Sequence, residues 1–377
     1  MNKSKKNLSY VFITGRNERL QQKTKYAREF FYGYQSIDLE SFNLDIIEMY
    51  GQKSNLFINR ILKFVEKVVN KLTNLPTFYS EVITFNNLKK VFKADIVLAT
   101  NDRIGLSILP LILISKMFKK NKFISFAMGI FSNKESGKVI SFIQSMYLRL
   151  FFIISRKILF ISKSEFQIAK NNYRKYINKF IYLPFSVDQD FWIRNREYNP
   201  SDLNKILFIG NDGKRDYDLV FDIARKMKDK NFVFLSRNLP EETSKLHNVE
   251  LYIGDWNNNI FSDEFLRDIY EQSVLSIIPL KNSIQPSGQS VGLQSMMMGV
   301  PVMITKTIGF WDYDEFNHGE NIYFVNDNNI KEWENHINSL LSNKLLLKSL
   351  SKNGNLTVKN KFSLKNFSEN LKSILNS

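Results

Sequence analysis

The residues best suited to chemistry lie in one short stretch of the chain, which runs from Ile277 to Thr305 and reads IIPLKNSIQPSGQSVGLQSMMMGVPVMIT. Its middle is a polar loop in which Ser287, Gly288, Gln289 and Ser290 lead into a segment with the apolar spacing of a short helix. The N-terminus of a helix presents free backbone N–H groups and the positive end of the helix dipole. We therefore expect these four residues to bind an anion, and a diphosphate would suit the site.

The flanking elements must position this loop. Val274–Leu280 is an apolar run typical of a buried strand, and residues 281–288 carry the polar, Gly and Pro residues of a loop. The helix predicted over Gln289–Met298 ends at Gly299, and Val302–Thr305 is the next strand. A loop that follows a strand of a parallel sheet lies at the edge where such sheets bind ligands.

This stretch resembles the nucleotide-sugar site of GT-B glycosyltransferases, above all the retaining family 4, which includes many lipopolysaccharide and capsule enzymes. The resemblance rests on residues that follow the family's order of Leu-Glu-Ala-Met, then Gly, any residue, Pro and Val: Leu293, Gln294, Ser295, Met296, Gly299, Pro301 and Val302. It implies that Ser287–Ser290 face the donor diphosphate and that Gln294 faces the donor ribose. The family's two glutamates fall at Pro286 and Gln294, so this chain lacks both carboxylates. An amide can still bond a ribose diol.

A second loop at a strand end carries basic residues. The predicted strand KILFIG, residues 205–210, is followed by NDGKRDYD. In the resembled family this place holds a basic pair that neutralises the donor pyrophosphate, which implies that role for Lys214 or Arg215. Arg215 is favoured because a guanidinium can hold two oxygens at once. The alternative is a solvated turn in which Asp216 caps the following helix.

Three further strand ends offer candidates. Gly254-Asp255 follows the strand LYI, where the resemblance implies that backbone groups hold the nucleotide base; the alternative is a plain turn. Gly15 closes the first strand and is a candidate for donor contact. Asp102 ends the strand DIVLAT and is the one candidate for a general base, or else it is the N-cap of a helix that starts near Ile104.

The resembled family often has a histidine after the strand that matches KFISFA, where this chain has Met128-Gly129. A retaining mechanism in which the leaving phosphate takes the acceptor proton needs no enzymatic base, whereas an inverting mechanism needs one. The resemblance favours retention, and the missing carboxylates leave the stereochemistry open. No metal requirement is expected, because a helix dipole with Lys or Arg can stabilise the leaving group.

The order of elements predicts an α/β chain with two doubly wound, Rossmann-like domains. Apolar strand runs alternate with helices, which indicates parallel sheets covered on both faces. Six strands are expected at 10–14, 44–49, 95–100, 122–127, 157–161 and 180–183, and six more at 205–210, 232–235, 249–253, 275–278, 302–304 and 322–325. A helix is expected from Gly15 to about Tyr32.

The expected division has four parts. Residues 1–185 form an acceptor domain, 186–204 a linker, 205–360 a nucleotide-sugar-binding domain, and 361–377 a helix that packs back toward the first domain. The resemblance implies that the two domains face a cleft, as in the GT-B architecture.

Composition narrows the partners. The chain has 377 residues and no Cys, which excludes disulfides and Cys-ligated zinc. Residues 1–190 hold 31 Lys and Arg against 14 Asp and Glu, so the whole net charge of +16 lies in that half. No nucleic-acid motif accompanies the charge, so an anionic membrane surface is the expected partner. The apolar runs at Tyr147–Ile161 and Gly105–Ser115 are too short or too interrupted to span a membrane, and each is either core or a surface that rests on lipid.

These observations lead to one hypothesis and two alternatives. We expect a glycosyltransferase that uses a nucleotide-diphosphate sugar and a lipid-linked or glycan acceptor, works in surface polysaccharide synthesis, and lies in the cytoplasm at the inner face of the plasma membrane. The N-terminal segment lacks the pattern of a signal peptide. The alternatives are a catalytically degenerate GT-B scaffold and a GT-B sugar-nucleotide epimerase. A dinucleotide-dependent dehydrogenase is disfavoured, because no GxGxxG follows the first strand.

Overall fold

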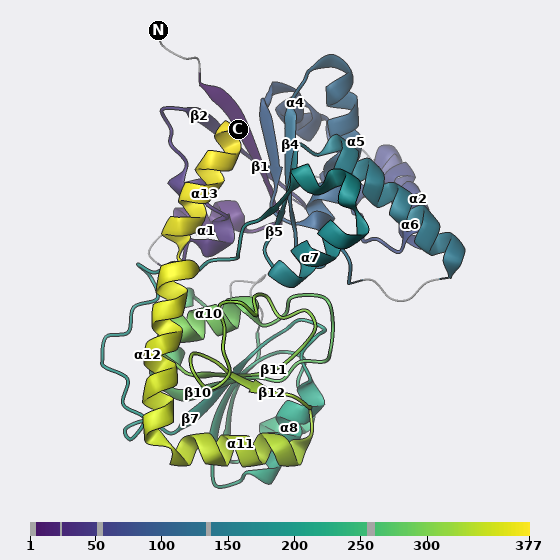
Figure 1. Cartoon of the computed structure of the whole chain (residues 1–377). Coiled ribbons are helices and arrows are strands. Elements are labelled where there is room, and N and C mark those ends of the chain that lie inside the picture. The colour runs from purple at the N-terminus through teal and green to yellow at the C-terminus, as the bar shows by residue number, and fades with distance from the viewer. Residues whose placement is uncertain (1–4, 23–24, 51–55, 133–136, 255–260) are drawn as a thin grey trace. The chain divides into compact units, whose positions relative to one another are not determined.

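The computed structural model describes residues 5–22, 25–50, 56–132, 137–254 and 261–377. The chain packs into two compact units, which are coloured along the sequence in Figure 1. The first unit contains Met1–Gln21, Phe31–Leu183 and Asn370–Ser377, and the second contains Gln22–Phe30 and Pro184–Glu369.

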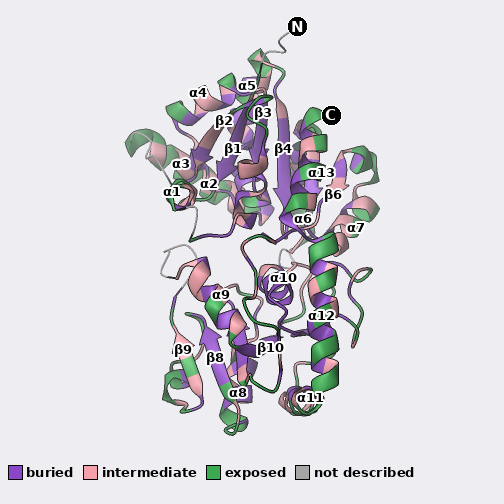
Figure 2. Ribbon diagram, turned by 90° about the vertical axis from the view of Figure 1, so that its left-hand side faces the viewer, coloured by how far each residue is buried: buried purple, intermediate pink, exposed green. Residues whose placement is uncertain are grey.

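The first unit is built on a six-stranded parallel sheet with the order β2-β1-β3-β4-β5-β6. Its strands are β1 (Lys6–Phe12), β2 (Phe42–Glu48), β3 (Ile96–Ala99), β4 (Lys122–Ala127), β5 (Lys157–Phe160) and β6 (Phe180–Tyr182). Its helices are α1 (Arg16–Gln21), α2 (Leu56–Thr73), α3 (Tyr79–Val82), α4 (Phe85–Lys93), α5 (Asp102–Phe118), α6 (Lys138–Ile154) and α7 (Lys163–Asn172). The central strands are buried along almost their whole length (Figure 2), which explains why they read as continuous apolar runs.

The second unit repeats this plan with the strand order β12-β11-β10-β7-β8-β9, again all parallel. Its strands are β7 (Lys205–Ile209), β8 (Asn231–Leu235), β9 (Val249–Tyr252), β10 (Ser273–Ile278), β11 (Val302–Thr305) and β12 (Tyr323–Val325). Its helices are α8 (Tyr217–Lys226), α9 (Asp263–Glu271), α10 (Gln289–Met297), α11 (Ile330–Ser342) and α12 (Lys344–Lys361), and α13 (Leu364–Asn376) begins in this unit. The predicted fold class, two doubly wound parallel α/β units, is confirmed.

The prediction of one helix from Gly15 to about Tyr32 is wrong. Among the described residues of this span α1 is the only α-helix, and a short 3-10 turn, η1 (Glu29–Phe31), leads to Tyr32 and Gly33, which both have positive φ. Residues 22–30 belong instead to the second unit, where Arg28 pairs with Asp188 over 2.6 Å. Ion pairs and hydrogen bonds with distant residues override the local helical preference of this segment.

The two long apolar runs of the sequence occupy different environments in the structure. Gly105–Ser115 lies inside α5, where Leu106, Ile108 and Ile112 are fully buried, so this run is core. Tyr147–Ile161 divides between the end of α6 and the buried strand β5. Part of α6 keeps large apolar side chains on the surface. No helix among the described residues is long and apolar enough to cross a membrane.

Candidate functional site

The predicted anion site is the start of α10. Gly288 stands at the N-cap with φ of +76°, a backbone conformation that L side chains rarely adopt, and an added Cβ would lie 2.8 Å from a methyl carbon of Ile278. The first hydrogen bond of the helix runs from Gly292 N to Gly288 O over 2.8 Å. The N–H groups of residues 289–291 precede that bond, so they are the donors that a bound anion would use.

A buried arginine lies next to this helix start. Arg215 Nη1 donates to Ser287 Oγ over 2.6 Å and contacts the Asp212 carboxylate at 3.1 Å, while Ser287 Oγ donates to Asp212 at 2.9 Å. The Arg215 side chain is only 3% exposed. Gly210 makes this possible, because a Cβ there would lie 2.4 Å from Arg215 Nε. A cation and a hydroxyl therefore lie immediately beside the first N–H groups of α10.

The neighbouring Lys214 is half-buried in the same loop. Its backbone N–H donates to Asp212 Oδ1 over 2.8 Å, and its carbonyl accepts from Lys281 N. No carboxylate among the described residues pairs with its ammonium group. The predicted capping role of Asp216 is confirmed, since its carboxylate accepts from Leu219 N at the start of α8. The cap and the basic pair thus occur together.

Asn211 connects the loops that follow three neighbouring strands, a role that was not predicted for it. Its Nδ2 donates to Gly254 O over 2.8 Å, and its Oδ1 accepts from Arg237 N over 2.8 Å and from Ser236 Oγ. Gly254 is thereby held beside the end of β7, and Asp255 lies outside the described residues. The available signal was an amide directly after the strand KILFIG, because an amide both donates and accepts.

Gln294 lies one turn into α10 and is fully buried. Its Nε2 donates to Glu29 Oε1 over 2.9 Å, and its Oε1 accepts from the Tyr270 hydroxyl over 3.2 Å. Glu29 also accepts from Trp192 Nε1 at 2.8 Å and from Asp188 N at 3.2 Å. Burial raises the pKa of Glu29 to about 8, aided by the charge of Asp263 and opposed by these side-chain hydrogen bonds. A contact between Gln294 and a ribose would require one of these partners to be exchanged.

The candidate base Asp102 belongs to the first unit. It is buried at the start of α5, where its Oδ1 accepts from Met128 N over 2.8 Å, and burial raises its pKa. The cap of α5 is Asn101, whose side chain accepts from Ile104 N. Glu165, whose pKa burial and the Asp102 charge raise to about 8, accepts from Gly129 N. The two buried carboxyl groups hold the loop after β4, in which Gly129 has φ of +105°.

Gly15 also lies in the first unit, in the turn between β1 and α1, with φ of +86°. The first N–H groups of α1, from Arg16 and Asn17, donate to Glu48 Oε1 at 2.7 and 2.9 Å. This helix start therefore already holds a carboxylate of the protein. Arg215, Lys214 and the residues of the 287–290 loop form one cluster in the second unit, and Gly254 is tied to its edge through Asn211.

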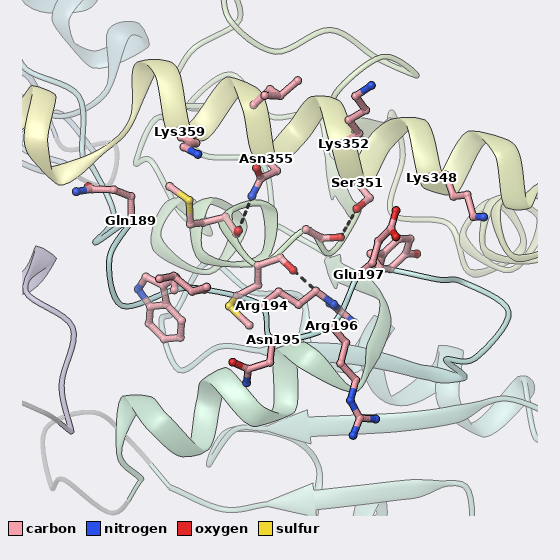
Figure 3. A pocket seen from close by; sticks show the side chains of 17 residues that line it. Gln189, Arg194, Asn195, Arg196, Glu197, Lys348, Ser351, Lys352, Asn355 and Lys359 are labelled. Carbon is pink, nitrogen blue, oxygen red and sulfur yellow. Dashed lines mark hydrogen bonds between the residues drawn. The ribbon is translucent and has the colours of Figure 1, made fainter.

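A surface hollow of about 600 Å³ lies elsewhere in the second unit, between the segment Gln189–Tyr198, the end of α10 and α12 (Figure 3). Two of its lining side chains bond to backbone at the end of α10: Asn355 Nδ2 donates to Met297 O and Ser351 Oγ to Gly299 O. Arg194 donates to Met298 O. These bonds join the linker and α12 to the end of α10. We therefore interpret the hollow as a place where three segments pack together and not as a ligand site. No group of side chains suited to hold a metal ion occurs among the described residues.

No protein-family model matches the chain, and no curated protein does either. Solved structures do match it. A glycosyltransferase from Rickettsia africae has a TM-score of 0.65 at 14% identity, with 99% of this chain and 98% of that chain covered. HepE from Anabaena in complex with UDP has a TM-score of 0.63 at 11% identity, with 98% and 99% covered. Sucrose-phosphate synthase from Thermosynechococcus elongatus has a TM-score of 0.65 at 11% identity, with 99% and 98% covered.

Structural matches at identities this low establish the fold. The reaction that the protein catalyses has to be inferred from the residues of its site. The matches extend over nearly the whole chain, and both parallel sheets lie within them. The chain therefore has the two-sheet GT-B fold of glycosyltransferases.

Proposed function

We propose that this protein is a glycosyltransferase that moves a sugar from a nucleotide-diphosphate donor to a lipid-linked or glycan acceptor. The observation that carries the proposal is the hydrogen bond from Arg215 to Ser287 at the N-terminus of α10. It places a buried positive charge and a hydroxyl beside the N-terminus of a helix, which is the combination of groups that a diphosphate requires. The UDP in the HepE structure makes uridine donors the first to test.

In the proposed site, the donor diphosphate lies on the N–H groups of residues 289–291 and on the Ser287 hydroxyl. The Lys214 ammonium approaches from the adjacent loop. Arg215 is a positioning residue, because its buried charge acts on the diphosphate through Ser287. Gly254 and Asn211 lie where the nucleotide base would be held, and Gln294 fixes α10 from its buried side or exchanges a partner for the ribose.

Transfer breaks the bond between the anomeric carbon and the phosphate oxygen and forms a bond from that carbon to an acceptor oxygen. Negative charge grows on the leaving diphosphate, and the helix dipole with Lys214 and Arg215 stabilises it. We propose retention, with the leaving phosphate taking the acceptor proton. If the product has the inverted configuration by NMR, a base is required, and Asp102 is the residue to replace first.

We assign binding of the acceptor to the first unit. Its strongly basic sequence fits an acceptor or surface rich in negative charge, which supports a lipid-linked acceptor at the inner face of the plasma membrane and a role in surface polysaccharide synthesis. The matched structures include a sucrose-phosphate synthase, whose name indicates a small-molecule product, so the acceptor of this chain must be established by assay.

A non-catalytic scaffold is the competing function, favoured by one observation. Both carboxylates of the resembled motif are absent, at Pro286 and Gln294, and Gln294 is fully buried. Such a scaffold could still bind nucleotide sugar, so binding and turnover must be measured separately.

The test is thermal stabilisation of the full chain by UDP, GDP, CMP and dTDP sugars. A ligand at 100 times its dissociation constant adds about 2.7 kcal/mol, which is readily seen as a rise in Tm. We expect one nucleotide to stabilise the protein and Lys214→Ala to weaken the effect, while Lys281→Ala, an exposed lysine next to the site, leaves it unchanged. Stabilisation without sugar transfer to any acceptor would favour the scaffold, and no stabilisation at all would overturn the proposed site.

A further inference from the structure

The helix α2 leaves its apolar side uncovered. Over its 18 residues only Thr73 is buried, and Phe57 and Phe64 are 72% and 69% exposed. Further exposed apolar residues extend along the helix: Leu56, Ile58, Ile61, Val65, Val68 and Leu72. A surface helix of a globular protein normally turns such a stripe toward the core. A continuous exposed apolar stripe marks an interaction surface.

Basic residues run beside this stripe. Arg60, Lys63, Lys67 and Lys71 recur every three or four residues, so they share one side of α2. At 100° per residue this side borders the side that carries Phe57, Phe64 and Val68. The only acidic residue of the helix, Glu66, accepts from the backbone and hydroxyl of Ser80, which directs it toward the protein. The outward charge of α2 is therefore entirely positive.

Helix α6 extends the same surface. It packs beside α2 and exposes Val139, Phe142, Met146 and Ile153, with Phe142 65% exposed. The spacing of these residues places them on one side of the helix. Lys138 and Arg149 are its charged residues, and α6 contains no acid. We call the exposed apolar and basic residues of α2 and α6 the α2–α6 surface.

The combination of side chains selects the occupant. Two copies of this surface would bring lysines against lysines, which disfavours a symmetric dimer. A nucleic acid would satisfy the lysines and leave the phenylalanines in water. An anionic bilayer accepts both, since apolar side chains enter the acyl boundary while Lys and Arg meet the lipid phosphates. The positive net charge of residues 1–190 acts in the same direction.

We propose that the α2–α6 surface docks this protein on an anionic lipid bilayer, with Phe57, Phe64 and Phe142 inserted and the basic residues of α2 on the headgroups. This names the surface behind the membrane association proposed above. It requires neither donor binding nor transfer, so it stands or falls separately from them.

The experiment is co-sedimentation of the full chain with vesicles of phosphatidylcholine alone or mixed with phosphatidylglycerol. We expect binding to the mixed vesicles that weakens with salt. The double variant Phe64→Ser with Phe142→Ser should lose about tenfold or more in vesicle affinity, because two large apolar side chains no longer enter the bilayer. Lys63→Glu with Lys67→Glu should lose the preference for anionic vesicles.

Matched controls lie on α12, in the other unit. Leu345 is 82% exposed, and Lys348 and Lys352 have the same four-residue spacing as Lys63 and Lys67. Leu345→Ser and Lys348→Glu with Lys352→Glu should bind vesicles like the wild type. All variants should keep the wild-type Tm and the same stabilisation by nucleotide, which separates this test from that of the donor site. A wild type that ignores mixed vesicles, α2–α6 variants that bind like the wild type, or a dimer that the Phe variants dissociate would each overturn the proposal.

Discussion

Gln294 Nε2 donates a hydrogen bond to Glu29 Oε1 over 2.9 Å, and both side chains are fully buried, although 265 positions separate them in the chain. The bond ties the helix that carries the candidate diphosphate site to a short segment from the N-terminal part of the chain. Trp192 and Tyr270 complete the cluster through their own hydrogen bonds to Glu29 and Gln294. The position of α10 therefore depends on residues far from the donor loop.

Gln294→Ala should lower the free energy of unfolding by about 1–3 kcal/mol, because it leaves buried Glu29 and Tyr270 each short of a partner. Urea unfolding of the full chain measures this. Gln167→Ala, an exposed glutamine on α7, is the control and should be neutral. If Gln294→Ala keeps full stability and loses nucleotide binding, Gln294 contacts the donor directly.

The stability of the protein should fall as pH rises between 4.5 and about 8. Burial raises the pKa of Glu29 from 4.5 to about 8, so within this window the folded state keeps a proton that the unfolded state has lost. Stability from this group is complete below the window and lost above it. Glu29→Gln, which cannot titrate, should flatten the decline. Burial also raises the pKa of Glu165, to about 8, and that of Asp102, so both carboxyl groups should contribute to the remaining slope. Equal slopes for wild type and Glu29→Gln would contradict this account.

Asp212→Asn should tighten nucleotide-diphosphate binding by about fivefold. The Asp212 carboxylate occupies Arg215 and Ser287 and repels a phosphate at the same place, and two charges at 4 Å in water interact by about 1 kcal/mol. Calorimetric titration with UDP measures the change. The matched control is Asp222→Asn, which removes the same i,i+3 pairing from Arg225 on α8, away from the loop. Weaker binding by Asp212→Asn would show that this carboxylate helps to hold the donor.

Gly288→Ala should destabilise the start of α10 and reduce nucleotide binding. Alanine at φ of +76° costs about 1–2 kcal/mol, and its Cβ would press on Ile278. Gly213→Ala in the neighbouring loop is the control, because φ there is not positive and nothing lies within 4 Å of an added Cβ. Thermal unfolding with and without nucleotide separates the two effects. Equal behaviour of the two variants would mean that the helix start tolerates a side chain.

Sugar transfer should continue in the presence of a metal chelator. Lys214, Arg215 and the positive end of α10 supply the charge that the departing diphosphate needs. Initial rates with EDTA, and again after Mg²⁺ or Mn²⁺ is added back, test this expectation. A rate that falls with EDTA and recovers with metal would assign charge stabilisation to an ion.

Much of the fold could be predicted because local patterns of apolar and polar residues determine where the strands and helices form. The middle residues of runs such as DIVLAT and KILFIG are buried on both faces of a parallel sheet and are therefore apolar, and strands β3 and β7 form where those runs lie. The same holds for the donor loop. Gly288 and the polar residues around it precede an apolar segment, and α10 begins at Gln289 as expected.

The tertiary structure decided what distant residues do to one another. Arg28 and Glu29 leave the expected helix because Asp188, Trp192 and Gln294 form hydrogen bonds with them, and no local pattern records those partners. Arg215 was predicted as a phosphate ligand. Only the folded loops reveal that its guanidinium forms an ion pair with Asp212 and a hydrogen bond with Ser287. The apolar stripe of α2 has the same sequence signature whether it faces a core or water, and only the packing of the first unit leaves it exposed.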